Sequence, residues 1–303
     1  MYLIETKDLC KKYGNNFAVN NVNMHIPEKS IYGFVGENGS GKTTIMRLLT
    51  GLAEPTKGSF TMFGVDNKDR KIYQMRKQMS AIVETTSLVP TMNARDNMVF
   101  QELYLGINLS EDERRDLLKL VHLENVGNKK VKNFSLGMRQ RLGIALALIN
   151  KPKLMLLDEP MNGLDPQGIA ELRDLLIELN QKEGITVLIS SHILSELEKI
   201  ASTYGFISHG QLIEEITVDE LQEKCRKSIK IKVDNLDNID SVFAKGNIKD
   251  YKISSNGDIQ VYDEIDIIDL VKIIDKSRLK ILAINSRDES VEEYYLNLIK
   301  EVK

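Results

Sequence analysis

The segment GENGSGKT, residues 36–43, constrains the fold of this chain more than any other. It has the pattern G-x-x-x-x-G-K-[S/T] and lies between a strand-like run, IYGFVG, and an amphipathic helical run, KTTIMRLLTG. Glycines let the backbone wrap around an anion, and the following helix adds its positive N-terminal dipole. Lys42 would reach the β- and γ-phosphates of a nucleotide, and the Thr43 hydroxyl would help to hold Mg²⁺. We therefore predict a nucleotide-binding loop rather than a glycine-rich structural turn.

Apolar runs with the composition of strands recur through residues 1–218. Their continuous apolar character is typical of strands buried on both faces of a sheet. Helical patterns separate them, and the pattern in residues 166–184 places leucines at helical spacing and reaches a stop at Gly184. This alternation predicts an α/β domain with a mainly parallel sheet. The runs are residues 31–36, 79–83, 153–158, 185–190 and 204–208.

Residues from about 86 to 150 interrupt this alternation and are mostly helical in pattern. Two candidate helices cover residues 94–107 and 110–126. Ser110, followed three residues later by Glu113, gives a capping-box signal for the second. We predict a helical insert within an ATP-binding domain that spans residues 1–218.

Residues 219–303 differ in composition, being rich in Lys, Ile, Asp and Asn. Asn256-Gly257, between two short strand-like runs, is a strong hairpin signal. The element order, strand-helix-strand-strand-helix-strand with a tail helix, predicts a small α+β accessory domain of the ferredoxin-like type. The strand candidates are residues 228–233, 251–254, 259–262 and 279–286, and the helix candidates are residues 238–244, 265–277 and 290–302.

Two more strand candidates end in polar residues that suit a nucleotide site. In KLMLLDEP, residues 153–160, the apolar run ends in Asp158 and Glu159, and ITVLISSH ends with His192. The carboxyl ends of strands form the edge at which α/β sheets bind ligands. Asp158 suits Mg²⁺ coordination through water, Glu159 suits a base that orients or deprotonates the attacking water, and His192 is placed to reach a γ-phosphate. Alone, the acidic pair would be an ordinary start of a loop.

The segment NFSLGMRQRLGIALALI, residues 133–149, predicts a second helix N-terminus suited to an anion. Ser135 is a good N-cap and Gly137 permits close backbone approach. One nucleotide needs one phosphate cradle, so the second cradle would close over a nucleotide held by another copy of the chain. The simpler alternative is that Ser135 caps a packing helix.

In this order, the motifs resemble those of the nucleotide-binding subunit of an ABC transporter over residues 1 to about 218. The resemblance assigns Walker A to residues 36–44, the signature motif to residues 135–140 and Walker B to residues 154–159. It makes Glu159 the catalytic glutamate, with Lys42 and the switch histidine His192 acting beside it. The residues it implies for ATP binding are Tyr13, Gly36, Asn38, Gly39, Ser40, Gly41, Lys42, Thr43, Thr44, Ser135, Gly137 and Asp165.

The resemblance also implies partners. Two ATP-binding chains would form a head-to-tail dimer, with each ATP between Walker A of one copy and the signature motif of the other. Hydrolysis would drive a separate integral membrane permease, so the chain is expected in the cytoplasm, peripheral to the inner face of the membrane. A single set of motifs fits a homodimer or a heterodimer. The loop of residues 85–93 and the helices after it would form the docking surface for the permease, with Leu88, Val89 and Met92 suited to a hydrophobic contact.

Two positions depart from the family pattern. Leu136 stands where the signature motif has glycine, and Glu84 stands where the family has the Q-loop glutamine. The resemblance gives that position access to Mg²⁺ and water, so Glu84 is expected to contribute to the metal site, with Thr43 and Asp158, and to catalysis. Glu84 and FSLGM resemble the branch that exports bacitracin-like and lantibiotic peptides for resistance or self-immunity. Residues 219–303 also look like that branch.

Composition narrows the alternatives. The net charge of −3 gives no basic field for nucleic acid, and we expect none as a partner. No apolar run approaches the roughly 18–20 residues of a membrane span, and the N-terminus lacks the pattern of a signal peptide. Cys10 and Cys225 lack metal spacing, so we expect two reduced thiols. The remaining alternatives are export of another drug or lipid, a soluble ABC-type ATPase, and a peptide-sensing binder with vestigial ATPase activity.

Overall fold

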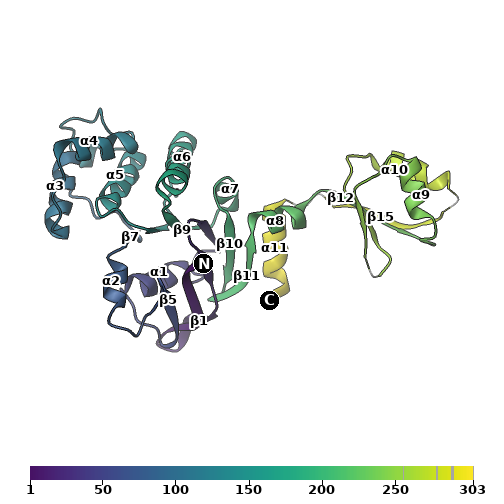
Figure 1. Cartoon of the computed structure of the whole chain (residues 1–303), viewed down its shortest axis with the longest axis horizontal. Coiled ribbons are helices and arrows are strands. Elements are labelled where there is room, and N and C mark those ends of the chain that lie inside the picture. Colours follow the sequence, from purple (N-terminus) through teal and green to yellow (C-terminus); the bar gives the residue numbers. More distant parts are fainter. Residues whose placement is uncertain (255, 278, 288–289, 303) are drawn as a thin grey trace. The chain divides into compact units, whose positions relative to one another are not determined.

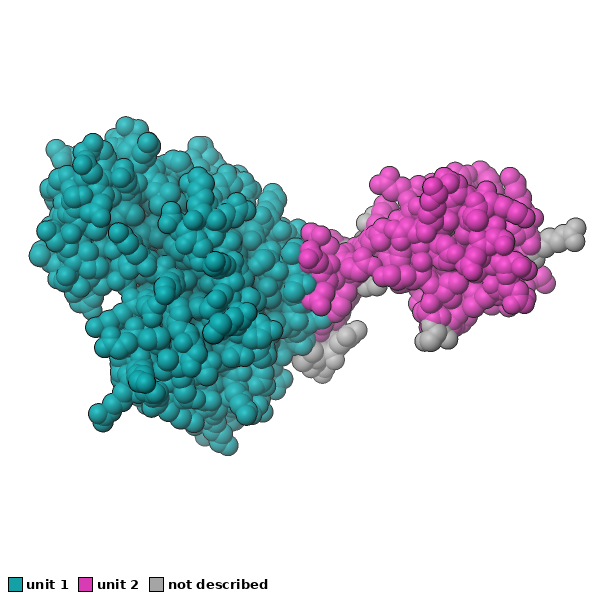
Figure 2. Space-filling view, in the orientation of Figure 1, with its two compact units in different colours: residues 1–218, 302–303 teal, residues 219–301 magenta. Residues whose placement is uncertain are grey.

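The computed structural model describes residues 1–254, 256–277, 279–287 and 290–302. The chain forms two compact units, residues 1–218 together with Val302, and residues 219–301 (Figure 2). Each unit has its own hydrophobic core, one that includes Phe34 and Leu156 in the first and one that includes Ile231 and Phe243 in the second.

The first unit is built on a six-stranded sheet with the order β11-β10-β4-β9-β8-β7 (Figure 1). Strands β10, β4, β9, β8 and β7 are parallel, whereas β11 pairs antiparallel with β10. All five strand candidates of this domain are therefore confirmed, with ends shifted by a residue at most. The strands are β4 (Ile31–Val35), β7 (Met79–Ile82), β8 (Leu154–Asp158), β9 (Thr186–Ser191), β10 (Thr203–Ser208) and β11 (Gln211–Thr217).

A second, antiparallel sheet was not predicted from the sequence. It has the order β2-β1-β5-β6, and β3 pairs with β1. Helix α1 (Lys42–Thr50) contributes Ile45 and Leu49 to a core that includes residues of both sheets. The strands are β1 (Tyr2–Tyr13), β2 (Asn16–Val22), β3 (His25–Pro27), β5 (Lys57–Met62) and β6 (Val65–Asp66).

Helix α6 (Pro166–Glu183) follows β8 and confirms the long helix expected from the leucine pattern. Its buried face is formed by Leu172, Leu175, Leu176 and Leu179. Gly184 ends the helix in the left-handed region at φ 67°, as predicted from the glycine stop. Two short helices, α2 (Ile72–Arg76) and α7 (Leu194–Leu197), complete the α/β part.

The predicted insert contains α3 (Ala94–Leu105), α4 (Glu111–Leu120), a 3₁₀ turn at Val131–Asn133 and α5 (Leu136–Leu148), grouped at one end of the first unit in Figure 1. The capping box at Ser110 is confirmed, because the Ser110 side chain accepts from the backbone N–H of Glu113 and the Glu113 carboxylate accepts from that of Ser110. Met98, Leu109, Leu146 and Ile149 form a small core of its own.

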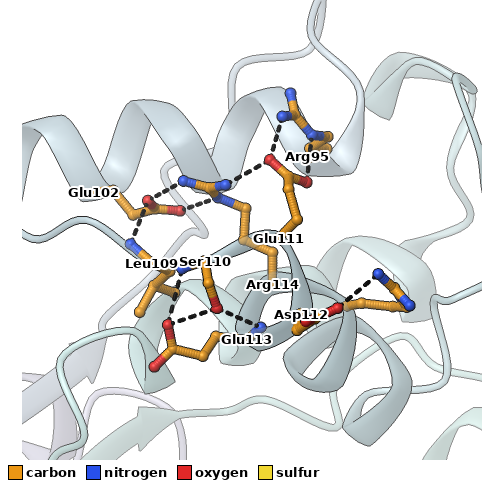
Figure 3. A network of polar contacts seen from close by, with 9 residues as sticks. Arg95, Glu102, Leu109, Ser110, Glu111, Asp112, Glu113 and Arg114 are labelled. Carbon is orange, nitrogen blue, oxygen red and sulfur yellow. Dashed lines mark hydrogen bonds and ion pairs between the residues drawn. The ribbon is translucent and has the colours of Figure 1, made fainter.

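A network of ion pairs connects α3 to α4 (Figure 3). The Arg114 guanidinium donates to both carboxylate oxygens of Glu102, at 2.7 and 2.6 Å, and to Glu111 at 2.6 Å. Glu102 also accepts from the backbone N–H of Leu109 at 3.0 Å. Because Glu102 and Arg114 are buried, these contacts satisfy charges that would otherwise be costly to remove from water.

The second unit contains an antiparallel sheet with the order β13-β14-β12-β15. Its strands and three of its helices follow the predicted order, whereas the helix at Val218–Cys225 was not predicted. Gly257 takes φ 82° within the predicted Asn256-Gly257 turn. Residues 255, 278, 288–289 and 303 of the predicted accessory domain lie outside the described residues. The elements are α8 (Val218–Cys225), β12 (Ser228–Val233), α9 (Ile239–Lys245), β13 (Tyr251–Ile253), β14 (Ile259–Val261), α10 (Ile267–Asp275), β15 (Ile281–Arg287) and α11 (Val291–Val302).

Within the described ranges, none of the helices combines the length and the apolar character that a membrane span requires.

Candidate functional site

The predicted phosphate loop connects β4 to α1, and its conformation requires glycine. Gly41 lies at φ 113°, and a Cβ atom there would come within 2.5 Å of the carbonyl oxygen of Ala18. At Gly36, a Cβ atom would meet both Ser40 Oγ and the carbonyl oxygen of Ile207 at 2.5 Å. The loop therefore folds tightly between strands β2 and β10 and leaves no space for side chains at these two positions.

Within the loop, Lys42 is buried, with 5% of its surface exposed. Its ammonium donates to the carbonyl oxygens of Gly36, at 2.5 Å, and of Glu37, at 3.2 Å. The charge is thus held inside the curve of the loop. Asn38 and Gly39 are exposed at the tip of the loop, and Thr44 is half-buried on α1.

Thr43 and Asp158 lie in direct contact at the start of α1 and the end of β8. The Thr43 hydroxyl donates to Asp158 Oδ2 at 2.7 Å. Asp158 Oδ1 accepts from the hydroxyl of Ser190, at 2.7 Å, on the neighbouring strand β9. Thr43 and Asp158, two of the residues predicted to hold Mg²⁺, are far apart in the sequence but therefore lie in contact in the fold.

Glu159, directly after β8, contacts two other predicted site residues. Its Oε1 lies 3.3 Å from Lys42 Nζ, and its Oε2 lies 2.7 Å from Nδ1 of His192. Because a carboxylate only accepts hydrogen bonds, Nδ1 carries the proton in this contact. Glu159 has a left-handed backbone at φ 49°, which is strained for a residue with a Cβ atom.

This arrangement fits a nucleotide with Mg²⁺. No described residue donates a hydrogen bond to Ser40 Oγ or to Glu159 Oε1, although both atoms are buried, so both have bonding capacity left for a ligand. The available ligands beside the loop are oxygens, the Thr43 hydroxyl and the Asp158 carboxylate, which suits a hard cation that also takes waters and phosphate oxygens. Among the described residues, no cluster of three or more His, Cys, Asp or Glu side chains forms a separate metal site.

The second predicted cradle lies at the start of α5. Ser135 caps the helix by accepting from the N–H of Met138 at 3.2 Å, so the simpler role considered for it is present. It also lines a cavity of about 440 Å³ together with Gly137 and Asp165. In the wall of this cavity, Arg141 forms an ion pair with Glu171. The Nε–H of Arg141 has no hydrogen-bond acceptor among the described residues. Burial lowers the pKa of the Arg141 guanidinium.

Asp165 has a local structural role that sequence reasoning missed. Its carboxylate caps α6 by accepting from the N–H of Gly168 at 2.9 Å, and Pro166 follows at the first helical position. The cap places Asp165 in the lining of the cavity beside Ser135. The sequence signal for it is the order Asp-Pro before a helical pattern.

Glu84 contacts a residue other than the predicted metal ligands, and Tyr13 is exposed. The Glu84 carboxylate is half exposed and pairs with Arg47 on α1, so the structure aims it at this guanidinium rather than at Thr43 and Asp158. Arg47 was not singled out in the sequence. Tyr13, at the end of β1, is 47% exposed, and Lys11 Nζ lies 5.0 Å from its ring centroid. A role of Glu84 at the metal and a role of Tyr13 at adenine remain predictions.

The chain matches known ATP-binding proteins. The family model described as "ABC transporter" matches residues 19–162. The bacitracin transport ATP-binding protein BcrA of Bacillus licheniformis is 37% identical over 299 residues, covering 98% of this chain and 97% of the relative. The lantibiotic transport ATP-binding protein SrtF of Streptococcus pyogenes is 46% identical over 217 residues, covering 72% of this chain and 92% of the relative.

Solved structures give the same result. The cbiO1 protein of Clostridium perfringens, part of the ABC transporter complex cbiONQ, matches with a TM-score of 0.65 and 26% identity over 74% of this chain and 91% of its own. A dimeric ATP-binding cassette in a post-hydrolysis state, bound to ADP and Pi, matches with a TM-score of 0.64 and 26% identity over 71% and 98%. Sequence, fold and site therefore agree that this chain belongs to the ATP-binding proteins of ABC transporters and is an ATPase.

Proposed function

We propose that this chain is the motor subunit of an exporter that moves a bacitracin-like or lantibiotic peptide out of the cell for resistance or self-immunity. The observation that carries the proposal is the match to BcrA, which extends over 98% of the chain and so includes the second unit. In this proposal residues 1–218 act as the ATP-binding domain and residues 219–303 as an accessory domain. The chain would work at the inner face of the membrane, attached to a permease.

In the proposed reaction, Lys42 exchanges its contact with Glu159 for the β- and γ-phosphates when ATP binds. Glu159 then takes a proton from the attacking water as the water oxygen bonds to the γ-phosphorus and the bond to the β–γ bridging oxygen breaks, leaving ADP and phosphate. His192 holds the Glu159 carboxylate by donating from Nδ1. A contact of Nε2 with the γ-phosphate would require the doubly protonated imidazolium, because phosphate oxygens only accept hydrogen bonds. Mg²⁺, bound by Thr43 and Asp158, would neutralise phosphate charge.

A second ATP-binding chain would complete each site. Ser135 and Gly137 offer a helix N-terminus beside a cavity, at a distance in the sequence from the loop that holds Lys42. A head-to-tail dimer would present this cavity to the phosphates bound by the partner copy. Support comes from the relative solved as a dimer with ADP and Pi.

The permease would dock on the insert. A cavity of about 450 Å³ lies between β7, the loop after it and α3. In this region Phe100 and Tyr104 on α3 are exposed by 52% and 81%, and such exposed apolar area favours an interaction surface. The loop residues expected to make the hydrophobic contact, Leu88, Val89 and Met92, are half-buried, and Leu88 packs on the core of the insert. Within the expected docking surface we therefore place the main contact on α3 rather than on the loop.

For the accessory domain, we infer a ferredoxin-like architecture. Its elements follow the order β12-α9-β13-β14-α10-β15, and its sheet has the order β13-β14-β12-β15 with antiparallel neighbours. Fold alone does not fix what this domain binds.

Deletion and complementation test the proposal. Deleting the gene for this chain should sensitise the host to a peptide antibiotic, and the wild-type chain should restore resistance, whereas Glu159→Gln should not. Purification of the tagged chain should also bring down an integral membrane protein. No shift across a panel of bacitracin-like and lantibiotic peptides would overturn the peptide assignment, and a shift for another drug or lipid would replace it.

A further inference from the structure

Ser190 lies at the centre of the catalytic edge, although none of the family motifs named above includes it. It is completely buried on β9, between the end of β8 and the phosphate loop. Its hydroxyl donates to Asp158 Oδ1 at 2.7 Å and accepts from the backbone N–H of Glu159 at 2.9 Å. One hydroxyl therefore contacts both acidic residues of the site.

The first of these bonds fixes the orientation of Asp158. With Oδ1 accepting from Ser190 and Oδ2 accepting from Thr43, the two oxygens of the carboxylate have different fixed partners. A rotation that turned the carboxylate plane away from Ser190 and Thr43 would break both contacts. Hydrogen bonds of this kind, from a residue that does not itself touch the metal, orient a metal-binding carboxylate, and their loss typically lowers metal affinity or activity.

The second bond stabilises the backbone of Glu159. That residue is held at φ 49°, in the left-handed region, which for a residue with a Cβ atom persists only when surrounding contacts determine it. Ser190 anchors the N–H, and the carboxylate at the other end of the residue then lies at Lys42 and His192. The hydroxyl thus helps to determine where the proposed base stands.

The neighbouring serine on β9 provides a contrast. Ser191 is also buried, but its hydroxyl accepts from the N–H of Ile193 at 2.9 Å and lies 3.1 Å from Glu196 Oε2, next to the start of α7. Both serines lie at the end of the same strand, but of their two hydroxyls only that of Ser190 makes hydrogen bonds to Asp158 and Glu159 among the described contacts.

We propose that Ser190 is a positioning residue that couples the metal-binding carboxylate to the proposed catalytic base. The hydroxyl keeps Asp158 turned toward the Mg²⁺ position and Glu159 turned toward Lys42 and His192. The proposal rests on the proposed roles of Asp158 and Glu159, and not on the transported substrate. Removing the hydroxyl should lower the affinity for Mg²⁺ and the turnover rate together, while contacts between the loop and nucleotide phosphates stay intact.

The experiment compares Ser190→Ala with Ser191→Ala in the full chain. For Ser190→Ala we expect kcat to fall by about 10–100-fold and the Mg²⁺ concentration for half-maximal activity to rise by a comparable order. ADP binding, measured by calorimetry, should weaken in Mg²⁺ but change by less than about twofold in EDTA. Ser191→Ala should keep the wild-type Mg²⁺ dependence, and Ser190→Thr should restore part of the loss because it retains a hydroxyl.

If Ser190→Ala does not fold, Ser190→Cys takes its place, since a thiol preserves the volume but is a weak hydrogen-bonding group. Wild-type Mg²⁺ dependence of both turnover and ADP binding in the folded variant would overturn the proposal, as would an equal loss in Ser191→Ala. The variant Glu159→Gln distinguishes a failure of the Ser190 proposal from a failure of the proposed catalytic base. Normal turnover in that variant would refute the role of the base itself, without reference to Ser190.

Discussion

Buried charges gather in two places in the first unit, the nucleotide site and the helical insert. In the insert, Arg114 donates to Glu102 and Glu111, and both oxygens of Glu102 accept hydrogen bonds (Figure 3). In the site, Glu159 Oε1 lies 3.3 Å from the Lys42 ammonium but receives no hydrogen bond from the described residues. The backbone of Glu159 is strained as well, with φ at 49°.

The difference separates a structural charge cluster from a reactive one. Buried ions stabilise a fold only when geometry and hydrogen bonds compensate their desolvation, as they do for Glu102 and Arg114. Unsatisfied buried groups and strained backbone persist where another requirement maintains them, and they concentrate at functional sites. Substitutions in the site should therefore affect turnover more than stability, and substitutions in the insert should do the reverse.

The largest expected effect comes from Glu159→Gln. The amide keeps the shape of the side chain but cannot take a proton from water, so kcat should fall by at least about a hundredfold. ATP binding should persist, and the stalled chain should accumulate as a dimer with ATP. Steady-state phosphate release and analytical ultracentrifugation with ATP measure these two properties.

The stability of the Glu159→Gln variant to urea is the control for the measurement of its turnover. Because the Glu159 carboxylate is only partly satisfied, replacing its charge should leave the urea midpoint of the first unit unchanged or slightly higher. Unchanged turnover would refute Glu159 as the base, and a large loss of stability would refute the contrast between the two clusters.

The second effect belongs to Glu102→Ala. This change leaves the buried Arg114 guanidinium without its bidentate partner, and breaking a buried pair typically destabilises by about 3 kcal/mol or more. Urea unfolding followed by a probe in the insert should show the loss, while kcat per folded molecule stays near wild type. Asp112→Ala removes an exposed pair with Arg115 and is the matched control, with an expected change below about 0.5 kcal/mol.

The sequence predicted the parallel sheet and the site better than it predicted the antiparallel sheet. Buried parallel strands are continuous apolar runs such as residues 154–157, and the ligand edge follows from their carboxyl ends. Strand β1 was missed because it is half exposed and carries charged residues such as Lys7 and Lys11, so its pattern is weak. The sequence also did not predict ion pairs between residues that are far apart along the chain. Nothing in the sequence near Glu84 indicates that Arg47 pairs with it.

The third effect is a dependence of stability on pH. Hydrogen bonds from Arg114, the largest cause, lower the pKa of Glu102 below its ordinary value, and the N–H of Leu109 adds to this. A lowered pKa in the folded state means that the stabilisation is complete above the unfolded pKa, about 4.3. It is then lost as the pH falls through the folded value.

Comparison of the wild-type chain with Glu102→Gln measures this dependence. Between about pH 5 and pH 3, the wild type should lose up to about 1.4 kcal/mol more per pH unit than the variant, which cannot titrate at this position. Equal slopes in urea unfolding across this range would show that the pair adds no pH-dependent stability. The same comparison with Asp112→Asn should show little difference, because that carboxylate is exposed.

The smallest effect on the isolated chain is expected from Glu84→Gln, which tests whether this residue belongs with the reactive cluster or with surface charge. The Glu84 and Arg47 side chains are 56% and 38% exposed, so the loss of their pair should change the free energy of unfolding by no more than about 0.5 kcal/mol. Glu84 nevertheless has a left-handed backbone, at φ 68°, directly after β7 and before the insert where the permease is proposed to dock. We therefore expect ATPase activity of the purified chain to change by less than about fivefold, the equivalent of a surface pair, while resistance in cells falls further.

Arg47→Ala, which removes the partner and leaves the carboxylate, is the matched control for the ion pair. Wild-type behaviour of Glu84→Gln in both assays would show that the charge at this position is incidental, and a loss of activity with a higher Mg²⁺ requirement would place Glu84 in the metal site after all.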